Sequence, residues 1–292
     1  MNFPLLEALL SQNVELVEKD LASDHTSVEK RESSIRALIV FAAHYLATPD
    51  MMDPFVLSTA FARSANSPEE FGPRAMALFN YAISRNRIPL DSALLKPLDG
   101  KNQVVSVRDL DHALSKGSFE EVVHVVRDLL SIMDNKSYFS ELLFRVALER
   151  NVQSINAVHA FSTGVDLIGW KNHFTPFLIL HVIQVLCRAN NDLTTISSPE
   201  SKTDWPNSHI SCLADLELYA SCCTIRRSAK LLSKDLEQRL AKLWNVFFAG
   251  KRSDNWQIPQ DGLDEIRFRG ALATIGEDLP SAFRDSKISL EL

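Results

Sequence analysis

Residues 152–188 read VQSINAVHAFSTGVDLIGWKNHFTPFLILHVIQVLCR and decide the fold class of this chain. The apolar residues of 152–168 and of 176–188 recur at helical spacing, and both segments are apolar around most of their circumference. A helix that is apolar on nearly all sides is usually buried, and consecutive helices joined by a short loop usually pack as neighbours. We therefore expect two adjacent core helices, the first ending at Gly169.

Each of these two predicted helices carries a few polar residues three or four positions apart, which places them on one face. Burying a polar group without a partner costs roughly 1–3 kcal/mol, so such groups pair with one another or bind something. We expect the two polar stripes to face one another inside the core. They consist of Asn156, His159, Thr163 and Asp166 in the first helix and of His181, Gln184 and Arg188 in the second.

The stripes leave two interpretations open. In the first, they line a histidine pocket together with His44, which lies in an apolar helical segment without a charged neighbour. Neutral imidazole with a carboxylate suits iron, zinc or manganese. The predicted metal ligands are then His44, His159 and His181, and the predicted catalytic residues are His159, His181 and Asp166. In the second interpretation, each histidine forms an ordinary hydrogen bond in the core and Arg188 neutralises Asp166.

The segment from Ser118 to Leu186, about a quarter of the chain, resembles helical, histidine-bearing proteins of the questin-oxidase-like kind, some of which are joined to Rieske domains. The resemblance lies in the helix that carries His159, the Gly169-Trp170 turn and the apolar helix through His181. It implies an oxidative or metal-assisted function, with iron or another divalent metal as the cofactor class. The Rieske Cys-x-His pattern is absent from the sequence, so the resemblance implies no such cluster.

Helix start and stop signals also punctuate the rest of the chain. Asp53-Pro54 combines an N-cap with a proline at the first helical position, and Ser118-x-x-Glu121 is a capping box. The segment 233–249 forms a helical pattern that Gly250 closes. Because proline clashes with the preceding turn, we expect a helix to begin at Pro73. The sequence predicts an all-α fold of about ten to twelve helices, arranged as an irregular bundle or an α-solenoid-like array.

A polar stretch rich in Ser, Thr and Pro separates two parts of the chain, and a long connection of this kind is either functional or a boundary. We expect a main helical core over 1–189, a polar linker or lid over 190–207 and a C-terminal helical extension over 208–292.

Charge and cysteine content exclude several classes of protein. The 31 Lys and Arg against 37 Asp and Glu give a net charge of -6, which argues against a nucleic-acid partner. The four cysteines form no Cys-x-x-Cys pair and are typical of a reduced protein. The N-terminus lacks a signal-peptide pattern, and no apolar stretch reaches the roughly 20 residues of a membrane span. We therefore expect a cytoplasmic protein without a membrane partner.

Two function classes remain open, because the sequence contains no phosphate-binding loop, dinucleotide fingerprint or nucleophile elbow. The first is an oxidoreductase-type or metal-dependent protein that takes a small-molecule substrate into the histidine pocket. The second is a non-catalytic helical module that binds a protein partner in a groove between helices. The second class predicts an exposed apolar groove near Trp205 or near Trp244, Phe247 and Phe248.

Overall fold

A computed structural model describes most of the chain, with gaps. The described residues are 1–22, 26–45, 47, 52–65, 67–85, 88–95, 105–116, 118–133, 137–189, 210, 212–229, 238–241, 243, 259 and 262–276. Over these residues the fold includes twelve α-helices and one short 3₁₀ helix, with further helical residues at 238–241 and 243, which confirms the predicted all-α class.

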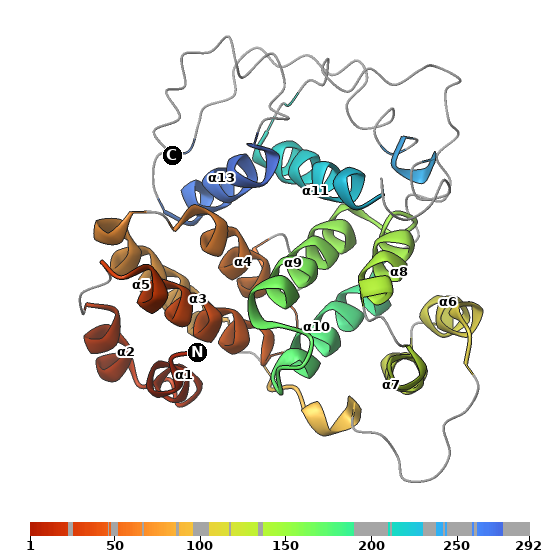
Figure 1. The fold of residues 1–292 in the computed structure, drawn as a ribbon, viewed down its shortest axis with the longest axis horizontal. Helices are drawn as coiled ribbons and strands as arrows, with labels where there is room; N and C mark the ends of the chain where they lie inside the picture. Colours follow the sequence, from red (N-terminus) through yellow and green to blue (C-terminus); the bar gives the residue numbers. More distant parts are fainter. Residues whose placement is uncertain are drawn as a thin grey trace.

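The first five helices form one side of the molecule (Figure 1). They are α1 (Phe3–Leu10), α2 (Val14–Leu21), α3 (Val28–Ala43), α4 (Pro54–Ser64) and α5 (Pro68–Ser84). Asp53 caps α4 as predicted, because its carboxylate accepts the backbone N–H of Phe55 at 2.8 Å and Pro54 follows at the first helical position.

The middle of the chain supplies the 3₁₀ helix η1 and five α-helices. They are η1 (Ser92–Leu95), α6 (Val107–Lys116), α7 (Phe119–Ile132), α8 (Ser137–Ala147), α9 (Val152–Ile168) and α10 (Thr175–Arg188). The two helices expected from the sequence are thus α9 and α10, and they pack against each other. Gly169 ends α9 with a φ of 91°, a left-handed value that favours glycine.

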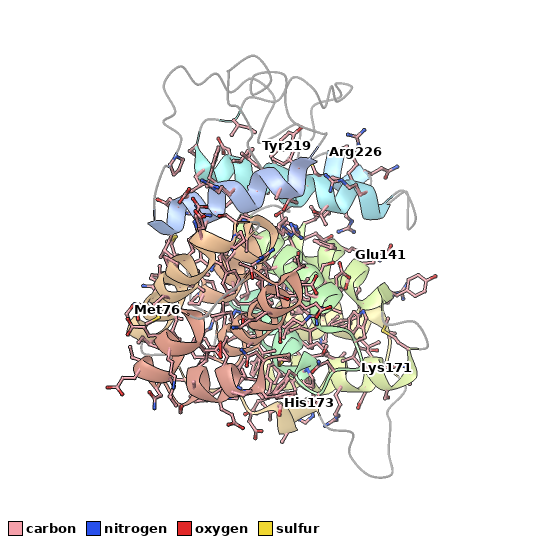
Figure 2. All side chains as sticks on the ribbon, turned by 60° about the vertical axis from the view of Figure 1, so that its left-hand side comes forward. Met76, Glu141, Lys171, His173, Tyr219 and Arg226 are labelled. Atoms are coloured by element: carbon pink, nitrogen blue, oxygen red, sulfur yellow. The ribbon has the colours of Figure 1, made fainter. Side chains whose placement is uncertain are left out.

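Two C-terminal helices, α11 (Leu213–Ala229) and α13 (Gly262–Ile275), form a layer across α4 and α9. Figure 2 shows this layer above the remaining helices, with Tyr219 and Arg226 of α11 labelled. Buried apolar side chains run without interruption from α1 to α13, so both helices share the core of the preceding segment. The predicted linker 190–207 and most of the predicted helix 233–249 lie outside the described residues.

The prediction that a helix begins at Pro73 is wrong, because α5 runs through this proline from Pro68. Phe71 before the proline and Ala75 after it are both almost fully buried, so core packing holds the helix on either side. Gly72 also permits a close contact, since a Cβ at this position would lie 2.5 Å from the carbonyl oxygen of Leu21 in α2. Tertiary packing thus overrides the local preference.

Two further expectations bear on the class of protein. Within the described ranges, no helix combines the length and the apolar character that crossing a bilayer requires. All four cysteines are free, and burial raises the pKa of Cys187 to about 11, so this thiol is unreactive at neutral pH.

Candidate functional site

The polar stripe of α10 fastens this helix to the segment between α3 and α4. Gln184 accepts the backbone N–H of Ala47 at 2.6 Å, and Arg188 donates to the carbonyl oxygen of the same residue at 3.0 Å. His181, which is completely buried, lies 2.9 Å from the carbonyl oxygen of Tyr45 and 3.0 Å from the Asp53 carboxylate. This stripe satisfies buried main-chain groups, as the second interpretation of the sequence expects for the core.

Both ring nitrogens of His181 face acceptors. Nδ1 faces the Tyr45 carbonyl oxygen, and Nε2 faces an Asp53 oxygen that already accepts the N–H of Phe55. Only an imidazolium carries a proton on each nitrogen and can donate both hydrogen bonds. With a neutral ring, the Asp53 carboxyl would instead carry the proton of the second hydrogen bond; in either case the contact joins α10 to the start of α4.

Among the described residues, neither His44 nor Asp166 forms a hydrogen bond or ion pair with His159 or His181. His44 follows the last residue of α3 and is half-buried, with its ring centroid 4.4 Å from that of Phe177. Burial lowers the pKa of His44 below its ordinary value. Asp166 is exposed on α9, and the predicted ion pair with Arg188 is not formed because this arginine binds the Ala47 carbonyl oxygen.

The expectation that the two stripes face one another is therefore wrong. His181 contacts the α3–α4 connection, whereas His159 points toward α4, α11 and α13. The structure does not bring His44, His159 and His181 to one point. The described part of the chain contains no group of three or more His, Cys, Asp or Glu side chains placed to hold a metal ion.

The polar stripe of α9 instead forms a site with residues that come from three other helices. His159 accepts a hydrogen bond at Nε2 from the guanidinium of Arg63, which closes the last turn of α4. The Nδ1 atom of His159 lies 3.0 Å from the hydroxyl of Ser221 in α11. Arg63 also donates to the hydroxyls of Thr163 in α9 and Thr274 in α13.

The hydrogen bonds of this site run in one direction only. A guanidinium only donates, so Nε2 of His159 accepts and the remaining ring proton is on Nδ1. Nδ1–H then donates to Ser221, whose hydroxyl donates to Oδ1 of Asn156 at 2.9 Å. Because Oδ1 of Asn156 accepts from Ser221, the NH₂ group of Asn156 is the last donor in this series of hydrogen bonds.

The NH₂ group of Asn156 is a buried donor that has no acceptor among the described residues. The residue is only 5% exposed, yet it lines a cavity. Leaving a buried donor unpaired costs about 1–3 kcal/mol, so native structures rarely do so without a bound water, ion or ligand.

Electrostatics keep His159 neutral. Burial, the largest cause, and the nearby charges of Arg63 and Arg227 hold the pKa of His159 well below its ordinary value. Burial also lowers the pKa of Arg63 to about 10, with Arg227 acting in the same sense and Asp166 opposing it. Arg63 thus remains charged at neutral pH.

The same geometry argues against a serine nucleophile at this site. A general base would have to accept the proton of the Ser221 hydroxyl at Nδ1 of His159. That tautomer carries its proton on Nε2, where Arg63 already donates. In this arrangement His159 and Ser221 therefore do not form a base–nucleophile pair.

The cavity lies between the α4–α9 pair and the α11–α13 layer. Its volume, counted as the space open to the centres of water molecules, is about 40 Å³. Its polar lining includes Arg63, Asn156, His159, Glu217, Ser221 and Arg267, and the remaining lining is mostly small apolar side chains. A single water needs about 10–15 Å³ on this measure, so the cavity accepts about three to four non-hydrogen atoms.

A charged pair forms one wall of this cavity. Arg267 of α13 donates from Nε and Nη2 to the two carboxylate oxygens of Glu217 in α11, both at 2.7 Å. The bidentate pair connects the two helices of the layer, whereas Arg63 forms no salt bridge with a carboxylate of the described residues. With His159 neutral, two arginines and one glutamate give the lining a surplus of one positive charge.

Arg63, Ser221 and Thr274 were not among the predicted site residues. A signal for Arg63 exists in the sequence, since it is the only charged residue in the segment 54–64 that forms α4. Ser221 and Thr274 carry no such signal, because they reach the site only through the packing of α11 and α13 on α9 and α4.

The comparisons with known proteins add no relative for this chain. Neither the models of protein families, nor the curated proteins, nor the solved structures include one that matches it.

Proposed function

We propose that this protein binds a small carboxylate in the cavity between α4, α9, α11 and α13. The observation that carries the proposal is the NH₂ group of Asn156, a residue that lines the cavity: this buried donor has no acceptor in the described part of the chain. A carboxylate oxygen is the acceptor that gains most from such a donor, because charged hydrogen bonds are about twice as strong as neutral ones.

The charge of the lining favours an anion over a neutral ligand. Arg63 contacts only the neutral partners His159, Thr163 and Thr274, and no described carboxylate lies within ion-pair distance of it. Asp166 acts on Arg63 at longer range without forming a salt bridge, so an anion in the cavity lowers the cost of burying this guanidinium. The volume limits the bound group to about the size of acetate.

Acetate is the probe for the test, and acetamide, its neutral counterpart of the same shape, is the comparison. The chain is titrated with each to about 50 mM while the side-chain NH₂ resonances of Asn156 are followed by ¹⁵N nuclear magnetic resonance. We expect saturable acetate shifts with a Kd of the order of 1 mM, within the limit for a ligand of four non-hydrogen atoms. Acetamide is expected to bind at least about tenfold more weakly.

The variant Asn156→Asp replaces the unpaired donor by a second carboxylate oxygen without a change in shape. It is expected to abolish acetate binding, because the new charge occupies the position that the ligand carboxylate takes. Asn80→Asp makes the same chemical change at an exposed position of α5 and serves as the matched control. Unmoved Asn156 resonances, or equal binding of acetate and acetamide, would overturn the proposal and would indicate that water occupies the cavity.

The other functional hypotheses stay predictions. The oxidoreductase-type or metal-dependent function gains no support from the contacts of His44, His159 and His181. The interaction groove near Trp205 or near Trp244, Phe247 and Phe248 lies outside the described residues. The cytoplasmic location and the absence of a nucleic-acid partner likewise rest on the sequence alone.

A further inference from the structure

A second pocket lies where α7, α10, η1 and the α9–α10 turn meet, far from the cavity beside Asn156. Its volume is about 270 Å³ on the same measure, several times that of the first cavity. In Figure 2, Lys171 of the α9–α10 turn lies in the lower part of the molecule, whereas Tyr219 of α11 lies in the layer at the top. The two pockets share no lining residue, so the second is an independent site.

The lining of this pocket is mostly apolar. Leu95, Leu130, Trp170, Pro176 and Ile179 supply the apolar surface. Trp170 also packs edge-on against two buried phenylalanines, with centroid distances of 5.7 Å to Phe161 and 6.4 Å to Phe139. The indole is therefore fixed by the core and offers a rigid surface to a flat or apolar ligand.

Three of the polar lining residues use their hydrogen bonds within the fold. Ser131 donates to the carbonyl oxygen of Asp128, and Thr175 donates to that of Gly169. Asn172 donates to the carbonyl oxygen of Ile168 and accepts the N–H of Phe174. These side chains shape the pocket rim and do not require a ligand.

Arg127 is the exception among the polar lining residues. Its side chain is 9% exposed, and its Nε atom donates to the Asp128 carboxylate at 3.2 Å. The two terminal NH₂ groups of this guanidinium have no acceptor among the described residues. Four of its five N–H donors are therefore available to a ligand in the pocket that the residue lines.

We propose that this pocket binds an organic acid with an aromatic or aliphatic body, whose carboxylate pairs with the terminal NH₂ groups of Arg127. A guanidinium holds a carboxylate through two parallel hydrogen bonds, and the rigid fork fixes the orientation of the ligand. The body of the acid then lies against Trp170 and the aliphatic side chains. The inference does not depend on the function proposed for the Asn156 cavity.

The probe for the test is 3-phenylpropionate, with 3-phenylpropan-1-ol as the uncharged comparison. The full chain is labelled with 5-fluorotryptophan, and the ¹⁹F resonance of Trp170 is assigned with Trp170→Phe. We expect the acid to shift this resonance in a saturable manner and to bind at least about tenfold more tightly than the alcohol. Asn156→Asp is expected to bind the acid as the wild type does, which separates the two sites.

Charge removal at the pocket provides the second measurement. Because Arg127→Met alone leaves a buried Asp128 unpaired, it is combined with Asp128→Asn, and folding is checked by circular dichroism. The double variant is expected to lose the preference for the acid over the alcohol, whereas Arg36→Met at a half-buried position of α3 retains it. Equal binding of acid and alcohol to the wild type, or a Trp170 resonance that neither probe moves, would overturn the proposal even if the double variant failed to fold.

Discussion

His159 and His181 contact opposite ends of one helix. His181 lies against Asp53, which caps the start of α4, and His159 accepts a hydrogen bond from Arg63 in its last turn. Ten residues separate the two α4 positions, which corresponds to about 15 Å along the helix axis. The two ends of α4 thus give the two histidines opposite environments: His181 faces a carboxylate, and His159 faces a guanidinium.

These environments predict different protonation states for the two rings. His181 faces two acceptors and is expected to carry a proton on both nitrogens, whereas His159 is expected to carry one on Nδ1 only. The ¹⁵N chemical shifts of the two rings at neutral pH distinguish these states directly. A neutral His181 would mean that the Asp53 carboxyl itself holds the proton in this hydrogen bond.

His181→Ala is expected to destabilise the fold strongly. The substitution removes the His181 ring from the buried Asp53 carboxyl, and breaking a buried pair in this way costs about 3–5 kcal/mol. Urea unfolding monitored by circular dichroism measures the loss. His124→Ala at an exposed position of α7 is the control, with an expected change within about 0.5 kcal/mol. A loss below about 1 kcal/mol for His181→Ala would contradict a stabilising contact between His181 and Asp53.

The helices could be predicted from the sequence because their signals are local. The spacing of apolar residues, the Asp53 cap and the Gly169 stop each depend on neighbours within a few positions. Pro73 misleads for the same reason: its local effect favours a helix start, but burial of Phe71 and Ala75 decides the outcome.

The candidate site could be predicted only in part. The pattern places Asn156 and His159 on one face of α9, and in the structure both residues line the cavity. It does not reveal which helix this face contacts, because the spacing within one helix carries no information about its partners. Because α10 follows α9 in the sequence, it is the expected neighbour of this face. The partners come instead from α4, α11 and α13, and the last of them, Thr274, is distant in the sequence. Long-range packing determined the site.

The lowered pKa of His159 predicts a stability that falls in mild acid. The unfolded chain binds a proton on this residue below a pH of about 6.5, whereas the native site stays neutral to a lower pH. The unfolded state therefore holds more protons in that window, and the free energy of unfolding decreases as the pH falls. The contribution of His159 to the free energy of unfolding is fully present above a pH of about 6.5. Below that value the free energy of unfolding falls with a slope that approaches about 1.4 kcal/mol per pH unit.

His159→Gln isolates this contribution, because glutamine can still accept from Arg63 and donate to Ser221 without titrating. The wild type must be compared with this variant because other groups also make the free energy of unfolding depend on pH. Burial also lowers the pKa of His44, which therefore changes the free energy of unfolding in the same direction as His159. Burial raises the pKa of Glu217, which therefore changes the free energy of unfolding in the opposite direction. Urea unfolding between pH of about 7.5 and 5 is expected to give a shallower pH dependence for the variant. Identical slopes for both proteins would contradict a neutral His159.

Gly270→Ala tests how closely the α11–α13 layer must approach α4 to form the cavity. A Cβ at Gly270 would lie 2.6 Å from the carbonyl oxygen of Ala60 and 2.7 Å from its Cβ, so the backbones must separate. Overpacking of this kind costs about 1–3 kcal/mol, which exceeds the gain in helix propensity of up to about 1 kcal/mol. Gly164→Ala is the matched control, because the atom nearest to a Cβ at this position is at the end of the Leu178 side chain, which can move.

We expect Gly270→Ala to unfold at a lower urea concentration than Gly164→Ala. We also expect it to bind acetate more weakly, since Ala60 and Gly270 both line the cavity. The reverse order of stability would show that α13 does not depend on this contact.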